Sequence, residues 1–263
     1  MATPTAIPAF RDNYIWCLAD PQAGKALVVD PGQAALVEAY LERHGLVLDT
    51  VLVTHHHPDH VGGIGALRNQ HPNCRVVGPA DSPFRGTTET VREGDTVQWQ
   101  GFRFRVLSVP GHTLDHIAYF TEPEGEPPLL FCGDTLFVCG CGRLFEGSPA
   151  QMRHSLAKLR ALPDTTRVHC AHEYTLANLT FARSFLPDDT SLVEFERQCR
   201  NQRDAGVPTV PSVLAKERRL NPFLRWDEPS VAEAARRYAA DRNLPAGTDD
   251  EVFAAIRHAK DHF

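Results

Sequence analysis

The chain has 263 residues, 42% of them hydrophobic and 23% charged, which is a composition typical of a globular protein with one large domain or a domain plus a smaller one. The formal net charge of −6 argues against a nucleic acid or an anionic membrane surface as a partner. The sequence contains no run of 18 apolar residues, so it predicts no transmembrane helix.

Strands and helices alternate over the first two thirds of the chain. Short apolar runs that stop at turn residues predict strands, and apolar residues at helical spacing predict helices. The expected strands cover residues 14–19, 26–30, 50–54, 75–77, 102–109, 116–121, 129–132 and 167–171. The expected helices cover residues 34–43, 62–69 and 147–162. Ser148 followed by Pro149 is a cap residue with proline at the first helical position, which supports the last of these helices.

Beyond His172 the pattern becomes purely helical. Helices are expected over residues 176–185, 191–205, 230–242 and 249–263, with breaks at residues 206–211 and 221–222. The last helix opens with Thr248 and Glu251 in a capping-box pattern. We therefore predict an α/β domain over residues 1–173 and a helical domain over residues 174–263.

The first ten residues have neither the basic nor the apolar region of a signal peptide. The seven cysteines follow no tight spacing pattern, which indicates reduced thiols rather than a disulfide framework. These two observations predict a cytoplasmic protein, and we take a monomer as the starting assumption.

The strand predicted over residues 50–54 runs into a histidine-rich segment. His55, His57, Asp59 and His60 form an H-x-H-x-D-H pattern there. Alternate residues of an extended segment point the same way, so His55 and His57 are placed to share one metal ion. Asp59 and His60 follow directly and are placed to reach a second ion. Neutral imidazole and carboxylate ligands suit zinc, iron or manganese.

Three further candidate ligands each follow a predicted strand. They are His112 in Pro-Gly-His-Thr, Asp134 in Cys-Gly-Asp-Thr and His172 in Cys-Ala-His-Glu. With the first motif they make seven positions, which is about what two metal ions and a shared water require. A histidine-rich turn that binds metal adventitiously, or not at all, is the alternative, but it does not explain ligand residues at three more strand ends.

The H-x-H-x-D-H loop, followed by Gly-His, Gly-Asp and a later histidine, resembles the metallo-β-lactamase superfamily over residues 12 to about 173. The resemblance implies an αββα sandwich with a binuclear site at the edge of the sheets. It also implies the ligand sets, listed by metal: His55, His57 and His112 for the first; Asp59, His60 and His172 for the second; and Asp134 as the bridge.

A site of this kind implies hydrolysis by a metal-bridging hydroxide, because two nearby metal ions lower the pKa of a shared water toward neutrality. Asp59 and Asp134 are then the expected catalytic carboxylates. A thiolate leaving group has a pKa near 8.5 and departs with little protonation, whereas an amide needs a general acid. We find no obvious dedicated acid in the sequence, which weakly favours a thioester substrate.

Several segments narrow the resemblance to the glyoxalase II (hydroxyacylglutathione hydrolase) family. They are residues 10–14, 139–147, 172–175, 221–223 and 257–263, and together they extend it over essentially the whole chain. The resemblance implies hydrolysis of S-D-lactoylglutathione to glutathione and D-lactate, the second step of methylglyoxal detoxification. It also implies two divalent metal ions, with zinc as the preferred metal and iron or manganese as alternatives.

Four residues match the family's glutathione-binding positions: Arg143, Tyr174, Arg257 and Lys260. Glutathione carries two carboxylates, and an acidic protein needs local cations to hold them. Some family members have Lys in place of Arg143 and Tyr in place of Phe145. The second difference removes a hydroxyl and puts substrate affinity in question.

Four other functions remain open from the sequence. A one-iron persulfide dioxygenase shares the metal motif, but the helical region after residue 173 disfavours it. A β-lactamase is disfavoured because Asp134 stands where a cysteine ligand is expected. The net charge disfavours a nuclease, and seven intact ligand positions disfavour a non-catalytic metal-binding module.

Overall fold

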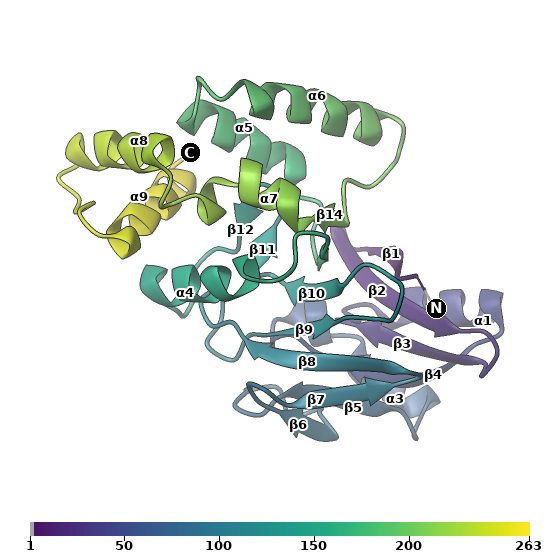
Figure 1. The fold of residues 1–263 in the computed structure, drawn as a ribbon. Helices are drawn as coiled ribbons and strands as arrows, with labels where there is room; N and C mark the ends of the chain where they lie inside the picture. Colours follow the sequence, from purple (N-terminus) through teal and green to yellow (C-terminus); the bar gives the residue numbers. More distant parts are fainter. Residues whose placement is uncertain (1–2) are drawn as a thin grey trace. The chain divides into compact units, whose positions relative to one another are not determined.

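The computed structural model describes residues 3–263, which form two compact units that interleave along the chain (Figure 1). The first unit comprises the described part of Met1–Ser108 together with Asp115–Gly133 and His169–His172. The second comprises Val109–Leu114, Asp134–Val168 and Glu173–Phe263. The predicted domain boundary near residue 173 divides the chain once along the sequence, and it stays a prediction.

The first unit contains a six-stranded mixed sheet in the order β1-β2-β3-β4-β5-β6. Its strands are β1 (Thr5–Ala9), β2 (Asn13–Asp20), β3 (Lys25–Val29), β4 (Val47–Leu52), β5 (Arg75–Pro79) and β6 (Glu89–Val91). The strands β1 to β3 pair antiparallel, and β3 to β6 pair parallel. Parallel neighbours need crossover connections, and α1 (Ala34–His44) and α3 (Ile64–Gln70) lie in two of them. Both helices bury their apolar face in the core with this sheet.

A second sheet of the first unit has the order β13-β10-β9-β8-β7. Its strands are β7 (Thr96–Trp99), β8 (Phe102–Ser108), β9 (Ile117–Thr121), β10 (Leu129–Gly133) and β13 (Arg167–Cys170). Every residue of β9 is buried. The hydroxyl of Tyr119 on β9 donates a 2.9 Å hydrogen bond to the carbonyl oxygen of Val53, which follows β4 in the other sheet. This bond links the two sheets of the unit.

The second unit is mainly helical and also holds a short ribbon of β11 (Leu136–Phe137) and β12 (Gly140–Cys141). Its helices are α4 (Pro149–Arg160), α5 (Thr175–Phe185), α6 (Thr190–Asp204), α7 (Leu214–Leu220), the 3-10 helix η1 (Pro222–Leu224), α8 (Pro229–Ala240) and α9 (Asp249–Asp261). The strand β14 (Ser212–Val213) pairs with Arg167 and Val168, the part of β13 that belongs to this unit. Within the unit, α5 packs on α6, and α9 packs on α4 and α8 (Figure 1).

Most predicted elements are present, and α4 and α9 start with the predicted capping boxes at Ser148 and Thr248. The helix predicted over residues 62–69 corresponds to α3, which begins at Ile64, and a separate short helix, α2 (Pro58–Val61), precedes it. The elements that were not predicted are the strands β1, β6, β7, β11, β12 and β14 and the helices α2, α7 and η1. The strand β1 contains a proline, and α7 has only seven residues, four of them charged, so neither gives a clear periodic signal.

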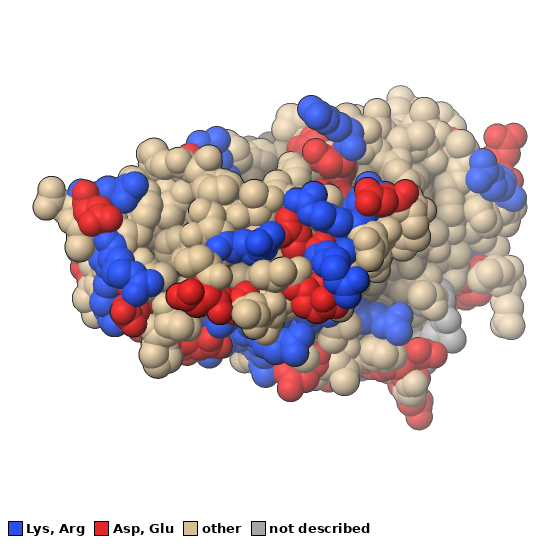
Figure 2. Space-filling view, turned by 90° about the horizontal axis from the view of Figure 1, so that it is seen from above, with Lys and Arg blue, Asp and Glu red and all other residues tan. Residues whose placement is uncertain are grey.

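Among residues 3–263, none of the helices is long and apolar enough to cross a membrane. Acidic and basic side chains are interspersed over the face of the molecule in Figure 2, with neither sign gathered into one stripe. Opposite charges also pair along α6, as Glu194 with Arg197 and Glu196 with Arg200.

Candidate metal centre and substrate-binding residues

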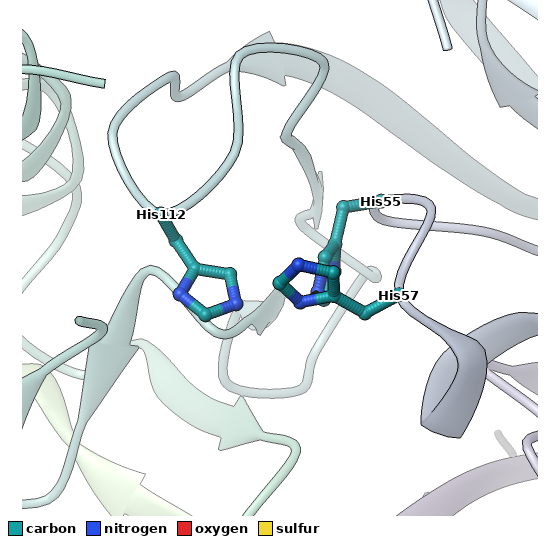
Figure 3. Close-up of side chains that lie close together, drawn as sticks. All are labelled: His55, His57 and His112. Atoms are coloured by element: carbon teal, nitrogen blue, oxygen red, sulfur yellow. Dashed lines mark hydrogen bonds between the residues drawn. The ribbon is translucent and has the colours of Figure 1, made fainter. Parts of the chain in front are cut away.

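In the first unit, the loop after β4 presents His55 and His57. The Nε2 atom of His55 lies 3.2 Å from the Nδ1 atom of His57, and His55 is fully buried. Figure 3 shows both side chains on this loop, and also the side chain of His112, which belongs to the second unit. The loop therefore brings the first two predicted ligands within reach of one ion.

Asp30, directly after β3, holds the start of this loop in place. Its carboxylate accepts hydrogen bonds of 2.8 Å from both the backbone N–H and the hydroxyl of Thr54. One of its oxygens also lies 3.1 Å from the Nδ1 atom of His60. The φ angle of Asp30 is 53°, a strained conformation for a non-glycine residue that is typical of functional sites. We did not identify Asp30 from the sequence, where its only signal is an acidic residue between a strand and a Pro-Gly turn.

Asp59, His60 and His172 form a three-residue group within the first unit. One ligand atom from each lies within 4.8 Å of the other two. The Oδ2 atom of Asp59 is 3.4 Å from Nε2 of His172 and 3.5 Å from Nε2 of His60. Both imidazoles are buried. Two imidazoles and one carboxylate at this spacing are a donor set that zinc, iron and manganese accept, so these residues fit a divalent metal ion.

Two neighbours orient this group from the start of β2. The side-chain amide of Asn13 donates a 2.9 Å hydrogen bond to Asp59. A carboxylate oxygen of Asp12 lies 2.9 Å from the Nδ1 atom of His172. Outer contacts of this type fix the tautomer and the ring orientation of metal-binding histidines. In the sequence, Asp12 and Asn13 belong to a segment that resembles the family, and the pattern indicates no role for either residue.

The carboxylate of Asp59 is stabilised in its ionised form. Burial acts to raise its pKa, but hydrogen bonds with His172, His60 and Asn13 and attraction by His60 hold the pKa well below its usual range. The backbone of Asp59 is also tightly packed, because a Cβ at Gly32 would lie 1.8 Å from the Asp59 carbonyl oxygen. Only glycine allows the two loops to approach so closely.

In the second unit, His112 and Asp134 lie side by side and are both buried. The Nε2 atom of His112 is 3.4 Å from the Oδ2 atom of Asp134. The Nδ1 atom of His112 lies 2.7 Å from the carbonyl oxygen of Arg143. A carbonyl only accepts, so Nδ1 carries the proton, and in the neutral ring Nε2 keeps its lone pair for a metal ion. Gly142 packs against this pair, since a Cβ there would lie 2.0 Å from the Asp134 carbonyl oxygen.

Two of the predicted substrate-binding residues converge on the carboxylate of Asp261. Arg257 donates a 3.0 Å hydrogen bond to its Oδ1 atom, and the Nε atom of Arg143 lies 3.7 Å from the same oxygen. Arg257 is only 5% exposed, and it also donates a 3.1 Å bond to the carbonyl oxygen of Cys141. Its Nε atom has no hydrogen-bond partner among the described residues. Arg143 is the exposed member of the pair, with 64% of its side chain accessible.

The other two predicted substrate-binding residues have separate contacts. Lys260 donates a 3.1 Å bond to the carbonyl oxygen of Ala177 and lies over the ring of Phe181. Burial and the charge of Arg257 lower the pKa of Lys260. The ring of Tyr174, 37% exposed, packs edge-on against Phe137.

Cysteine ligation is not indicated by the described residues. All seven cysteines are buried and reduced. Burial raises the pKa of Cys141 to about 11 in spite of the nearby Arg257 charge, so this thiol is protonated at neutral pH. Phe145, the position that differs from some family members, is 63% exposed and stands edge-on to the His112 ring.

Comparison with known proteins shows the family of the chain. The model of the metallo-beta-lactamase superfamily matches residues 14–172, and that of the hydroxyacylglutathione hydrolase C-terminus matches residues 173–263. Hydroxyacylglutathione hydrolases of Photobacterium profundum and Chromohalobacter salexigens are 48% and 49% identical to the chain, with all of each sequence covered. The crystal structure of ETHE1 from Myxococcus xanthus is similar with a TM-score of 0.65 and 27% identity, covering 98% of both chains.

These matches confirm the predicted fold class and show that the family resemblance extends through the helical region. The chain belongs to the metallo-β-lactamase superfamily and, within it, to the hydroxyacylglutathione hydrolase family.

Proposed function

We propose that the chain hydrolyses the thioester bond of S-(2-hydroxyacyl)glutathione to glutathione and a 2-hydroxy acid. With S-D-lactoylglutathione the acid is D-lactate. The observation that carries the proposal is the Asp59–His60–His172 group in a chain that matches hydroxyacylglutathione hydrolases over its full length. These relatives favour a hydrolase over the persulfide dioxygenase alternative.

The seven predicted ligands would hold two divalent metal ions. They are assigned by ion: His55, His57 and His112 to the first; Asp59, His60 and His172 to the second; and Asp134 to both. Zinc suits this donor set, as do iron and manganese. When bound, such ions polarise a carbonyl and lower the pKa of a water molecule to near neutrality.

The remaining polar residues would orient these ligands. Asn13 and Asp12 hold Asp59 and His172, and the carbonyl of Arg143 fixes the tautomer of His112. The ionised carboxylate of Asp59 would also orient a water molecule through a hydrogen bond. A thiolate leaving group departs with little protonation, whereas the leaving group of an amide needs a general acid. The described residues of the proposed site are metal ligands and bases, so the site fits a thioester better than an amide.

Arg143 and Arg257 would bind a carboxylate of glutathione. Both guanidinium groups already reach one carboxylate, that of Asp261. A substrate carboxylate would compete with Asp261 for the same donors, and an arginine side chain can donate two parallel hydrogen bonds to one carboxylate. Lys260 and Tyr174 would hold further polar groups of glutathione at the adjoining ends of α9 and α5.

We further propose that the enzyme acts as a monomer in the cytoplasm, without a nucleic acid or a membrane as partner. The intermixed charges of the face in Figure 2 and the net charge of −6 support the absence of a nucleic-acid or membrane partner. Sedimentation at several protein concentrations would test the monomer, and a mass that rises with concentration would contradict it.

The substrate is tested by product analysis with metal-replete protein. Incubation with S-D-lactoylglutathione should release D-lactate and free thiol in equal amounts. A parallel reaction with glutathione persulfide should consume no oxygen. Oxygen uptake without thioester cleavage would contradict the proposed hydrolase and support the persulfide dioxygenase.

A further inference from the structure

A fully buried carboxylate, that of Glu217 on α7, has no part in the proposed chemistry. Its exposed fraction is 0%. It accepts hydrogen bonds from the backbone N–H of Cys139 (2.8 Å), from the side-chain amide of Asn221 (3.2 Å) and from the hydroxyl of Ser212. All three donors are uncharged, and within residues 3–263 no salt bridge accounts for the burial of this group.

Asn221, at the end of α7, is also fully buried. Its amide nitrogen donates to the carbonyl oxygens of Phe137 (3.1 Å) and Gly140 (2.9 Å), and its amide oxygen accepts from the N–H of Phe223. Phe137 ends β11 and Gly140 starts β12. Asn221 therefore ties together the two strands of this ribbon at their turn.

The turn itself, Val138–Cys139, is held in a strained form. Cys139 has a φ angle of 53°, which is unfavourable for a residue with a side chain. Asn178 on α5 donates a 3.1 Å bond to the Val138 carbonyl oxygen. A Cβ at Gly140 would lie 2.4 Å from the Asn178 amide. Side chains on α5 and α7 thus both hold the turn by hydrogen bonds.

The residues that follow the turn provide hydrogen-bond acceptors for a proposed metal ligand and for a proposed substrate-binding residue. The carbonyl oxygen of Cys141 accepts from Arg257, and that of Arg143 accepts from His112. Between them, the N–H of Gly142 donates to the Thr135 carbonyl oxygen, next to Asp134. A displacement of β12 would therefore move the acceptors of a metal ligand and of a substrate-binding residue together.

We propose that Glu217 and Asn221 are positioning residues for the hydrolase. By bracing the Phe137–Gly140 turn they fix β12, and through β12 the carbonyls that orient His112 and Arg257. This inference rests on the proposed function, which gives His112 and Arg257 their roles.

A matched pair of substitutions at one position tests it. In Glu217→Gln the amide oxygen still accepts from Cys139 and Asn221, and the amide nitrogen donates to Ser212, so all three bonds persist. Glu217→Met has a similar volume but no comparable acceptor. We expect Glu217→Gln to keep kcat/KM within about twofold, and Glu217→Met to lose about tenfold or more through both a higher KM and a lower kcat.

Glu196→Met is the control, because Glu196 is a buried carboxylate of α6 whose hydrogen bonds, among the described residues, go to Arg183 and Arg200 and not to the turn. It should lower the melting temperature and leave kcat and KM unchanged. A folded Glu217→Met protein with the wild-type kcat and KM would overturn the proposal. Equal kinetic losses in Glu217→Met and Glu196→Met would do the same, because they would indicate general destabilisation.

Amide hydrogen exchange gives a readout that needs neither activity nor metal. In the wild-type chain the Cys139 amide should exchange slowly, and in Glu217→Met it should exchange much faster while the amides of β10 stay protected. Fast exchange of Cys139 in the wild type would overturn the bracing, even if Glu217→Met does not fold. An inactive wild type would refute the proposed function, and the exchange pattern would still decide whether the turn is braced.

Discussion

The Nδ1 atom of His112 donates a 2.7 Å hydrogen bond to the backbone carbonyl oxygen of Arg143. A predicted metal ligand is thus oriented by the main chain of a predicted substrate-binding residue. Because the bond uses the carbonyl, the side chain of Arg143 can be removed without losing it. The two proposed roles of this segment are therefore separable by experiment.

Arg143→Ala should raise KM for S-D-lactoylglutathione about tenfold and leave kcat nearly unchanged, because a contact made equally in ground and transition states acts on KM. Its metal content should equal that of the wild type. Arg92→Ala, at an exposed arginine paired with Asp81, is the control. Loss of metal from Arg143→Ala would show that the side chain, rather than the carbonyl, supports His112.

Asn13→Ala should weaken metal binding or lower kcat by about 10- to 100-fold, the usual cost of losing an outer contact to a ligand. The variant removes the amide that donates to Asp59. Metal affinity measured by competition with a chelator is the readout, and Asn69→Ala at an exposed position is the control. Unchanged affinity and kcat would remove Asn13 from the site.

Gly32→Ala and Gly65→Ala should have opposite effects on stability. A Cβ at Gly32 meets the Asp59 carbonyl oxygen at 1.8 Å, whereas one at Gly65, inside α3, meets nothing within 4 Å. We expect Gly32→Ala to cost about 1–3 kcal/mol of unfolding free energy or more and to lose metal. Gly65→Ala should add about 0.5–1 kcal/mol. Denaturant unfolding checks both values, and equal midpoints would contradict the tight packing at Gly32.

Asp49 on β4 should make the first unit sensitive to acid. Burial acts to raise its pKa, but hydrogen bonds from Lys25, Thr50 and Trp99 lower it overall. A lowered carboxyl pKa stabilises the fold above the ordinary value near 4, and this contribution is lost as the pH falls through the lower folded value. Asp49→Asn should therefore lower the free energy of unfolding at pH 7, and the difference from the wild type should shrink progressively below about pH 4. A pH-independent difference would contradict this assignment.

Features with local signals were predictable from the sequence. The caps at Ser148 and Thr248 lie within three residues of their partners, and the proposed metal ligands follow strands that β-branched and apolar runs indicate. The class of fold and the ligand types could therefore be expected before any coordinates.

Features that depend on distant segments were not predictable. Asp30 reaches Thr54 across 24 residues, and Glu217 reaches Cys139 across 78. An isolated acidic residue in a loop or on a short charged helix gives no sign of such a partner. The pairing of Arg257 with Asp261 could be expected from the sequence, because the two residues are four apart on one helix. The bond from Arg257 to the carbonyl oxygen of Cys141 could not.

The most direct test of the central claim is the rate of S-D-lactoylglutathione hydrolysis, followed by loss of the thioester, before and after removal of divalent metal by a strong chelator. The account predicts rapid cleavage that is abolished by metal removal and restored by about two equivalents of zinc, iron or manganese per chain. No cleavage by metal-replete protein, or cleavage that survives complete metal removal, would contradict it.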